Sequence, residues 1–414
     1  MKKSILILLF VIVGLQFSCS DSNEDTPPLT HTIIIEPPCL VSTSIVLTTQ
    51  AQVDAFTASG YCSVNGDLTI GSPNVTSDIT NLSGLKRLTT ISGFLIIRDN
   101  SNLSSLEGLQ NIVEVGALAV LNNDQLSTLN GLRGLDRLSG EKNVNIIGNL
   151  ALESLQGLEN LTAISYLALQ QNYSLSSIVA LHNLRSVNTL NILETGILSL
   201  AGLENLQVLQ SLYLYNNTNL YSLTGLGPIT NLNALRISGG VLNSLEGLET
   251  LQSVYSLEIS SNNTLTSLHG LESLSHADLF KIKMTSLSSL NGLENLTSVF
   301  DFGISYNQNL HSLSGLQNLH AVTDLVINEN PTLASISNLS GLTEFANITV
   351  SGQSITSLDG LQNLHPIGHN GGLTVYYSSS MHNDVCAISP YRDANDTVIL
   401  YLPNWPQGLF DNCN

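Results

Sequence analysis

The chain has 414 residues and a formal net charge of -19; 43% of its residues are apolar, 11% charged and 5% aromatic. This composition excludes a disordered chain, because there is enough apolar material to bury a large core, and it excludes a coiled coil. Because 32 Asp and Glu stand against 13 Lys and Arg, the chain would repel phosphate backbones, and we expect no nucleic-acid partner.

The N-terminus is typical of a secretory signal. Two lysines precede an apolar run at residues 5–15, which is too short to span a bilayer. Ser18 then stands directly before Cys19, and this arrangement resembles the lipobox of bacterial lipoproteins. The resemblance implies that residues 1–18 are a signal peptide and that Cys19 carries the lipid. The alternative is an ordinary secretory signal with an incidental cysteine.

Residues 19–38 are acidic at first and then proline-containing, which is typical of a solvated tether. The stretch resembles the acidic tag that follows the lipidated cysteine in some surface-exposed outer-membrane lipoproteins. No later segment has the apolar length of a transmembrane helix. We therefore expect a lipid-anchored protein at the outer membrane or cell surface.

Four further cysteines lie as one pair near each end of the chain: Cys39 with Cys62, and Cys386 with Cys413. Because exported proteins are oxidised, the spacing predicts two local disulfides. Each would close a loop of about 25 residues and stabilise the fold by roughly 3–4 kcal/mol. Zinc binding is the weaker alternative, because no CxxC spacing is present.

Residues 39–62 are expected to form an N-terminal cap. Residues 45–47 are predicted to be a short strand. The run Thr49-Gln-Ala-Gln52 predicts a capping box that opens a short helix through Phe56.

The middle of the chain consists of copies of one repeat. Each copy is recognised by a glycine that is followed by leucine. Ala180 replaces glycine in one copy. The glycines are Gly84, Gly108, Gly131, Gly157, Gly202, Gly225, Gly247, Gly270, Gly292, Gly315, Gly341 and Gly360. From Gly84 to Gly360 there are 360 − 84 = 276 residues in twelve intervals, a mean period of 23. A fixed period of this size predicts a solenoid.

Each coil places apolar residues three apart where the chain turns and then two apart, as at Leu325 and Ile327. A period of two indicates a strand with one buried face. We therefore predict a mainly β chain: a right-handed parallel β-helix or leucine-rich-repeat-like solenoid of about 13 coils at residues 63–377, with disulfide-stapled caps. The repeated glycine is expected to let the backbone turn or approach its neighbour closely.

Asparagine recurs three residues before the leading apolar residue of many coils. These residues are Asn100, Asn123, Asn149, Asn172, Asn217, Asn262, Asn307 and Asn330. Shorter coils carry Glu194, Gly239, Met284 or Gly352 at that place. Long and short coils alternate from Asn172 to Asn307, which gives a double unit of about 45 residues. We interpret the asparagines as structural, since a buried amide can satisfy backbone groups at a corner.

Residues 64–70, Leu82-Ser-Gly-Leu85, residues 91–97 and the coils after them resemble the receptor L-domain family, which is related to leucine-rich repeats. The resemblance covers about residues 62–377. It implies a β-helical ligand-binding module. The cysteine-rich modules and kinase of the receptors are missing, so signalling by the receptor route is not expected.

Residues 378–414 are expected to form a C-terminal cap. Tyr391, Tyr401, Trp405 and Phe410 gather there near the second cysteine pair. Because the ends of a solenoid expose apolar core, capping is the simplest interpretation of these aromatic residues. Sugar stacking is the alternative.

The chain lacks GxSxG, HExxH, P-loop and Rossmann motifs, and we expect no cofactor, no metal and no catalytic residue. His365 and His369 fall on an expected loop. Alignment of the strands gives two outward rows without paired acids: Tyr213, Arg236, Glu258, Lys281 and Gly303, then Tyr215, Ser238, Ser260, Lys283 and Ser305. A cross-strand ladder of Arg236, Glu258 and Lys281, which leaves only Lys283 free, is the simplest interpretation of the charges.

Five residues of these rows are the candidate ligand contacts, and we name them the aromatic–cationic patch: Tyr213, Tyr215, Arg236, Lys281 and Lys283. The leading hypothesis is a non-enzymatic surface lipoprotein that binds a protein or glycan, in adhesion or capture. The alternatives are a β-helix enzyme that degrades polysaccharides, which would need converging carboxylates, and a structural spacer.

Overall fold

The computed structural model describes residues 39–73, 77–351, 354–367, 371–376, 386–389, 398–401 and 413. The chain divides into two units, Met1–Glu36 and Pro37–Asn414, and the described structure is that of the second. Several expected features lie outside the described residues: the signal peptide (1–18), the tether (19–38) with Cys19, Gly352, His369, Tyr391, Trp405 and Phe410.

The described residues form 20 strands, one α-helix and five short 3-10 helices. The strands are β1 (Leu40–Val41), β2 (Ile45–Leu47), β3 (Ser63–Val64), β4 (Leu68–Ile70), β5 (Thr90–Arg98), β6 (Glu114–Leu121), β7 (Arg137–Leu138), β8 (Asn143–Ile147), β9 (Ala163–Gln170), β10 (Ser186–Leu193), β11 (Val208–Tyr215), β12 (Asn231–Ser238), β13 (Ser253–Asn262), β14 (His276–Thr285), β15 (Ser298–Ser305), β16 (Ala321–Asn328), β17 (Glu344–Val350), β18 (His365–Pro366), β19 (Gly371–Val375) and β20 (Val398–Tyr401). The helices are α1 (Gln50–Ala58), η1 (Ser83–Leu85), η2 (Asn130–Leu132), η3 (Val179–Leu181), η4 (Ser337–Leu339) and η5 (Cys386–Ile388).

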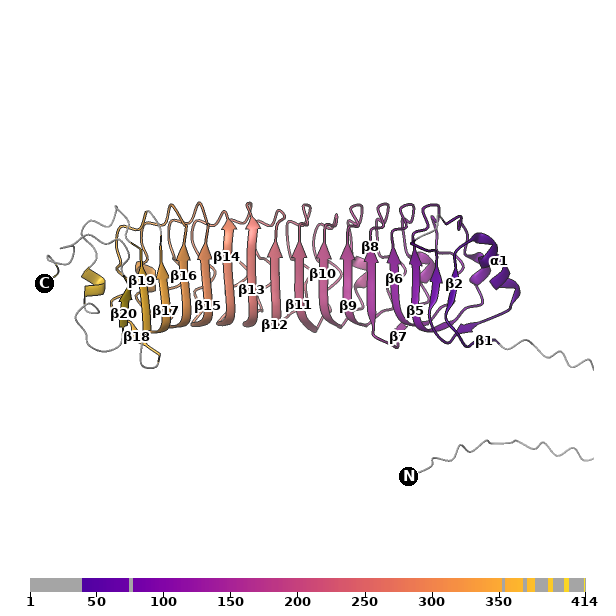
Figure 1. The fold of residues 1–414 in the computed structure, drawn as a ribbon, viewed down its shortest axis with the longest axis horizontal. Coiled ribbons are helices and arrows are strands. Elements are labelled where there is room, and N and C mark those ends of the chain that lie inside the picture. Colours follow the sequence, from indigo (N-terminus) through magenta and orange to yellow (C-terminus); the bar gives the residue numbers. More distant parts are fainter. Residues whose placement is uncertain are drawn as a thin grey trace, which may run out of the picture. The chain divides into compact units, whose positions relative to one another are not determined.

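The strands form one parallel sheet in which each coil supplies the next rung (Figure 1). Neighbouring rungs pair in register, as in Leu235 opposite Leu257 and Leu257 opposite Phe280. The predicted fold class is confirmed: the chain is a mainly β, leucine-rich-repeat-like solenoid of about 14 turns.

The core lies inside the coils and has the predicted spacing. One coil shows the pattern: Leu310, Leu313, Leu316, Leu319, Val322, Leu325 and Ile327 are all buried. The three-residue steps turn the chain, and the two-residue step from Leu325 to Ile327 lies on β16, where alternate side chains face one side. The outward side chains of the strands are therefore held on a fixed, regularly spaced frame.

Nine of the twelve repeated glycines have positive φ, and in these both reasons expected from the sequence apply. Gly270 has φ +108°, which side chains rarely adopt, and a Cβ there would lie 2.0 Å from the carbonyl oxygen of Leu245 in the preceding coil. Ala180 lies instead in the 3-10 helix η3, where the backbone is right-handed. This local geometry allows alanine in that coil, although Gly84 and Gly131 occupy the same place in η1 and η2.

The asparagines form a buried column along one corner of the coils, as predicted. The side chain of Asn149 accepts a hydrogen bond from the backbone N–H of Asn123 (3.0 Å) and donates to the carbonyl of Val120 (2.9 Å). All eight are at most 3% exposed. Each coil is thereby joined to its neighbour at a place where the strand has ended.

The assignment of the short coils needs a correction. The residue in the column is Thr195 rather than Glu194, because Glu194 adopts a left-handed turn with φ +54° just before it. Thr195 donates from both its backbone N–H and its hydroxyl to Asn217 Oδ1 (3.1 and 2.9 Å). In the same way Thr285, rather than Met284, stands opposite an asparagine of the preceding strand. In a coil that is one residue shorter, the residue after the left-handed one takes the place that asparagine has in the longer coils.

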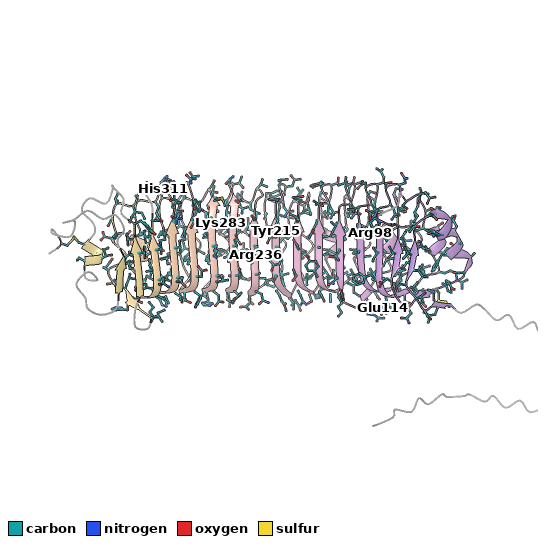
Figure 2. All side chains as sticks on the ribbon, in the orientation of Figure 1. Arg98, Glu114, Tyr215, Arg236, Lys283 and His311 are labelled. Carbon is teal, nitrogen blue, oxygen red and sulfur yellow. A yellow bond between two sulfur atoms is a disulfide. The ribbon has the colours of Figure 1, made fainter. Side chains whose placement is uncertain are left out.

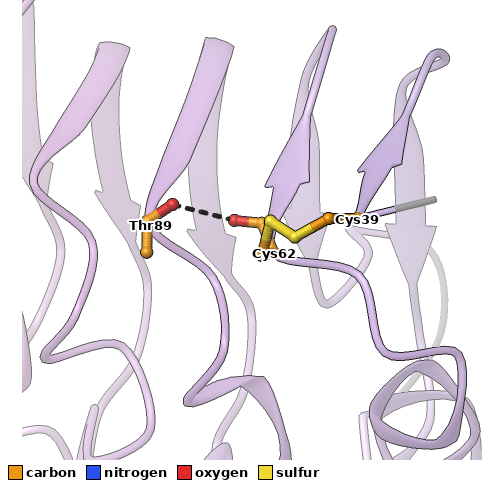
Figure 3. Close-up of a disulfide and its surroundings, with 3 residues drawn as sticks. All are labelled: Cys39, Cys62 and Thr89. Carbon is orange, nitrogen blue, oxygen red and sulfur yellow. Dashed lines mark hydrogen bonds between the residues drawn. A yellow bond between two sulfur atoms is a disulfide. The ribbon is translucent and has the colours of Figure 1, made fainter. Parts of the chain in front are cut away.

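Both predicted disulfides are present near the ends of the solenoid, Cys39–Cys62 and Cys386–Cys413. Thr89 anchors the first one to the next coil by donating its hydroxyl to the carbonyl of Cys62 (3.1 Å; Figure 3). Each disulfide lies at one end of the solenoid. Among the described residues, the strand at such an end is paired on one side only.

The expected cap helix and strand are confirmed. Thr49 caps α1, and Gln52 completes the capping box. The sheet nevertheless extends beyond the solenoid boundaries expected from the sequence. Strands β1 and β2 pair with β3 and β4 within residues 39–62, and β20 pairs with β19 after residue 377.

Candidate functional site

The predicted outward rows are aligned as expected on strands β11 to β15. Tyr213 lies opposite Arg236, Arg236 opposite Glu258, and Glu258 opposite Lys281. In the second row, Lys283 stands opposite Ser260, whose side chain is buried and donates to the hydroxyl of Ser238. The structure thus brings the five residues of the aromatic–cationic patch together on three strands, β11, β12 and β14, with β13 between the last two.

Two parallel tyrosine rings on β11 form one end of the patch. The ring centroids of Tyr213 and Tyr215 are 6.2 Å apart, with an angle of 8° between the ring planes. The guanidinium carbon of Arg236 lies 5.8 Å from the centroid of Tyr213, within the range of a cation–π contact. Figure 2 shows Tyr215, Arg236 and Lys283 on the strands in the middle of the row. An exposed contact of this kind contributes about 0.5–1 kcal/mol and holds Arg236 against the aromatic surface.

The charge ladder expected across the strands is wrong. Glu258 pairs diagonally with Lys283, with 2.8 Å between Oε1 and Nζ. Lys281 turns instead toward Asp301 on β15, at 3.7 Å between Nζ and Oδ2. Diagonal neighbours on a sheet are within reach of long side chains, so register alone does not decide the partner of a lysine.

Arg236 is consequently the cation without a carboxylate partner in the patch, judged over the described residues. Arg236, Lys281 and Lys283 carry three positive charges, and Glu258 and Asp301 carry two negative charges, so the group has a net charge of 3 − 2 = +1. The ion pairs are about a third to a half exposed, and such pairs contribute only about 0–1 kcal/mol each. A ligand could therefore exchange partners with either lysine at low cost.

A third outward row was missed by the sequence analysis. Asp301 lies opposite Asp324, and Asp324 opposite Asn347. Asn347 donates its amide to Asp324 (2.7 Å), while Asp301 faces Lys281. Neither carboxylate is buried in an apolar pocket, the environment that makes a carboxyl group a general acid. The row contributes polar contacts beside the patch.

Other ion pairs lie along the solenoid. Arg137 donates to Glu114, and this hydrogen bond lowers the pKa of the Glu114 carboxyl. His269 Nδ1 lies 2.5 Å from Glu272 Oε1, and the hydrogen bond raises the pKa of the imidazole. Both pairs are exposed, so each contributes little stability. Neither forms a buried charged site that could serve catalysis or binding.

Two absences apply to the described residues only. Among them there is no group of three or more His, Cys, Asp or Glu side chains placed to hold a metal ion. No helix in this part of the chain is long and apolar enough to cross a membrane.

Comparisons with known proteins find similar folds only. No family model matches the sequence, and a search of curated proteins finds no relative. An internalin, InlF of Listeria monocytogenes, is 20% identical with a TM-score of 0.35, over 86% of this chain and 84% of that one. The functional domain of InlJ from the same organism is 16% identical with a TM-score of 0.33, over 80% and 73%. TLR13, in complex with ssRNA13, is 14% identical with a TM-score of 0.29, over 84% and 69%. At these TM-scores the similarity says nothing about the ligand of this chain.

Proposed function

We propose that the protein is a non-enzymatic, surface-exposed lipoprotein that binds an acidic protein or glycan ligand on the outer face of its solenoid. The observation that carries the proposal is the aromatic–cationic patch, in which Arg236 lies over the ring of Tyr213 and Tyr213 stacks with Tyr215. Aromatic and arginine side chains are the types that dominate binding energy at protein interfaces.

The frame beneath the patch favours binding. Each side chain of the patch stands on a strand that is paired on both sides, so the backbone is already ordered before a ligand arrives. A ligand therefore loses little binding free energy to ordering of the protein. The acidic remainder of the chain repels an anionic ligand and leaves the patch as the favourable place for it.

Replacing the five residues of the patch with serine should weaken capture of an acidic probe at least roughly tenfold in Kd, because it removes both the aromatic surface and the cations. The probes are immobilised polygalacturonate, heparin and poly-L-glutamate, and binding is measured by surface plasmon resonance. Binding to the wild type should also weaken with salt, since exposed charges are screened within about 10 Å at 0.1 M ionic strength.

A matched control removes the same residue types elsewhere on the solenoid. It replaces Tyr173, Tyr221, Arg87, Lys86 and Lys142 with serine. It should bind like the wild type, and circular dichroism should show the same fold for both variants. Equal loss in the two variants would indicate a general charge effect, and unchanged binding in the patch variant would move the site elsewhere.

Membrane attachment is proposed through Cys19. The motivation is the lipobox-like sequence around this cysteine, which follows an apolar run of signal-peptide length. Cys19→Ser should move the protein from the membrane fraction to the soluble fraction, because a second anchoring segment was not found in the sequence. Fractionation and mass spectrometry of the mature N-terminus check this. A variant that stays with the membrane, or a mature N-terminus other than residue 19, would contradict lipid anchoring.

A further inference from the structure

A hollow of about 390 Å³ lies where strands β11 to β14 begin, beside the aromatic–cationic patch but outside it. We call it the strand-start hollow. Its walls include Asn231, Asn233, Tyr255, His276 and Asp278. The volume falls within the range of about 300–1,000 Å³ that is common for small-molecule sites. The walls combine one aromatic ring with amide, imidazole and carboxylate groups.

Two exposed aromatic side chains line the solenoid at this level. Tyr255 on β13 is 59% exposed, and Phe300 on β15 is 54% exposed. Asp278 occupies the same place on β14 between them, because the residues on either side of all three are paired in register. Two strand spacings separate the rings, roughly 10 Å. A ligand that runs along the solenoid axis would meet an aromatic surface, a carboxylate and a second aromatic surface.

The polar groups around the hollow are held in place by hydrogen bonds. Ser253 donates its hydroxyl to Asn231 Oδ1 (2.5 Å). Nδ1 of His276 lies 2.8 Å from the hydroxyl of Ser298, and its Nε2 lies 3.8 Å from Asp278 Oδ2. Asn231 and His276 are therefore oriented before any ligand binds, and the amide and carboxylate groups of the walls can donate or accept further hydrogen bonds.

We propose that the strand-start hollow, extended by Phe300 on the next strand beyond its walls, binds a neutral saccharide chain. A sugar ring has an apolar C–H face that can pack on Tyr255 or Phe300, and its hydroxyl groups both donate and accept hydrogen bonds. Amide and carboxylate side chains match such hydroxyls. Asp278, in a protein with a net charge of -19, opposes anionic ligands at this place. The proposal goes beyond the function proposed for the aromatic–cationic patch and does not rest on it.

The test is a neutral glycan array followed by isothermal titration of the strongest binder. The double variant Tyr255→Ala, Phe300→Ala should weaken that binding at least about tenfold, because both packing surfaces are lost. Asp278→Asn should weaken it less, since the amide still accepts a hydrogen bond. Tyr221→Ala is the matched control, as Tyr221 is 55% exposed but lies outside the hollow, and it should bind like the wild type.

Salt separates this site from the patch. Binding of a neutral saccharide should stay the same between roughly 0.05 and 0.5 M salt, whereas binding at the aromatic–cationic patch should weaken. The serine variant of the patch should keep saccharide binding if the two sites are separate. Absence of any neutral glycan binder, equal affinity in the double variant, or equal loss in the Tyr221 variant would overturn the proposal. Circular dichroism of each variant confirms that the solenoid is intact.

Discussion

Replacing Gly270 with alanine should lower the free energy of unfolding by roughly 2–5 kcal/mol. Two costs add together. The φ of +108° is strained for any residue with a side chain, and the new Cβ would lie 2.0 Å from the carbonyl oxygen of Leu245, which belongs to the backbone of the preceding coil. Because the carbonyl cannot rotate away, the two coils must separate. Thermal and urea unfolding followed by circular dichroism measure the loss.

Two controls test whether the loss depends on the place of the glycine. At Gly303, on the outward face of β15, a Cβ would meet only Lys281 Cγ, at 3.6 Å. Gly303→Ala should therefore be neutral or stabilise by about 0.4–1 kcal/mol, because the unfolded chain loses freedom. Ala180→Gly should destabilise slightly, by about 0.5–1 kcal/mol, since its coil turns through a 3-10 helix. Equal effects of Gly270→Ala and Gly303→Ala would show that close approach between coils does not govern the turn.

The register of the solenoid could be predicted because it depends on one quantity, the distance between successive core residues. Once Leu235, Leu257 and Phe280 are placed in the core, the residues after them must face outward in matching rows. The alignment of Tyr213 with Arg236 follows from this and is confirmed. Periodicity also predicts the buried asparagine column, since a polar residue that recurs at a corner must meet the same backbone groups in each coil.

The partners of the charged side chains could not be predicted in the same way. Glu258 has Lys281 directly opposite and Lys283 on the diagonal, and it pairs with Lys283. The choice depends on side-chain conformation and on Asp301, which attracts Lys281 from the next strand. These preferences are of the order of 1 kcal/mol or less, too small for a sequence pattern to reveal.

The sequence carries a signal for the strand-start hollow in the spacing of two aromatic residues. Tyr255 and Phe300 are 300 − 255 = 45 residues apart, which is the length of the double unit. An aromatic residue that recurs at this period must occupy equivalent places on alternate coils. Both are the third residue of their strand and directly follow a buried residue, so they face outward where strict alternation back from Leu257 and Phe302 would place them inward.

Asn149→Leu should destabilise the solenoid by roughly 3–5 kcal/mol. The substitution keeps the volume but leaves the N–H of Asn123 and the carbonyl of Val120 without their partner. Each buried backbone group that loses its hydrogen bond costs about 1–3 kcal/mol. The amide of Asn149 also contacts Asn172 Oδ1, so the damage reaches the coils on both sides. Unfolding by urea gives the total, and hydrogen exchange with mass spectrometry should show faster exchange in the flanking coils first.

Asn262 gives a graded comparison within the same column. Its side-chain oxygen is buried without a hydrogen-bond partner, while its amide donates to the carbonyls of Ile237 and Ser260. Asn262→Leu should therefore cost less than Asn149→Leu, by about 1–3 kcal/mol. The carbonyl of Ser260 also accepts from the backbone N–H of Gly239 (3.1 Å), so one backbone group fewer loses its partner. Asn160→Ala should cost about 1 kcal/mol or less, since Asn160 is exposed and makes one hydrogen bond, to the carbonyl of Arg133. If all three variants lost the same stability, the column would act through helical or strand propensity of the residue rather than through its hydrogen bonds. The order Asn149, Asn262, Asn160 is the result that hydrogen bonding between coils requires.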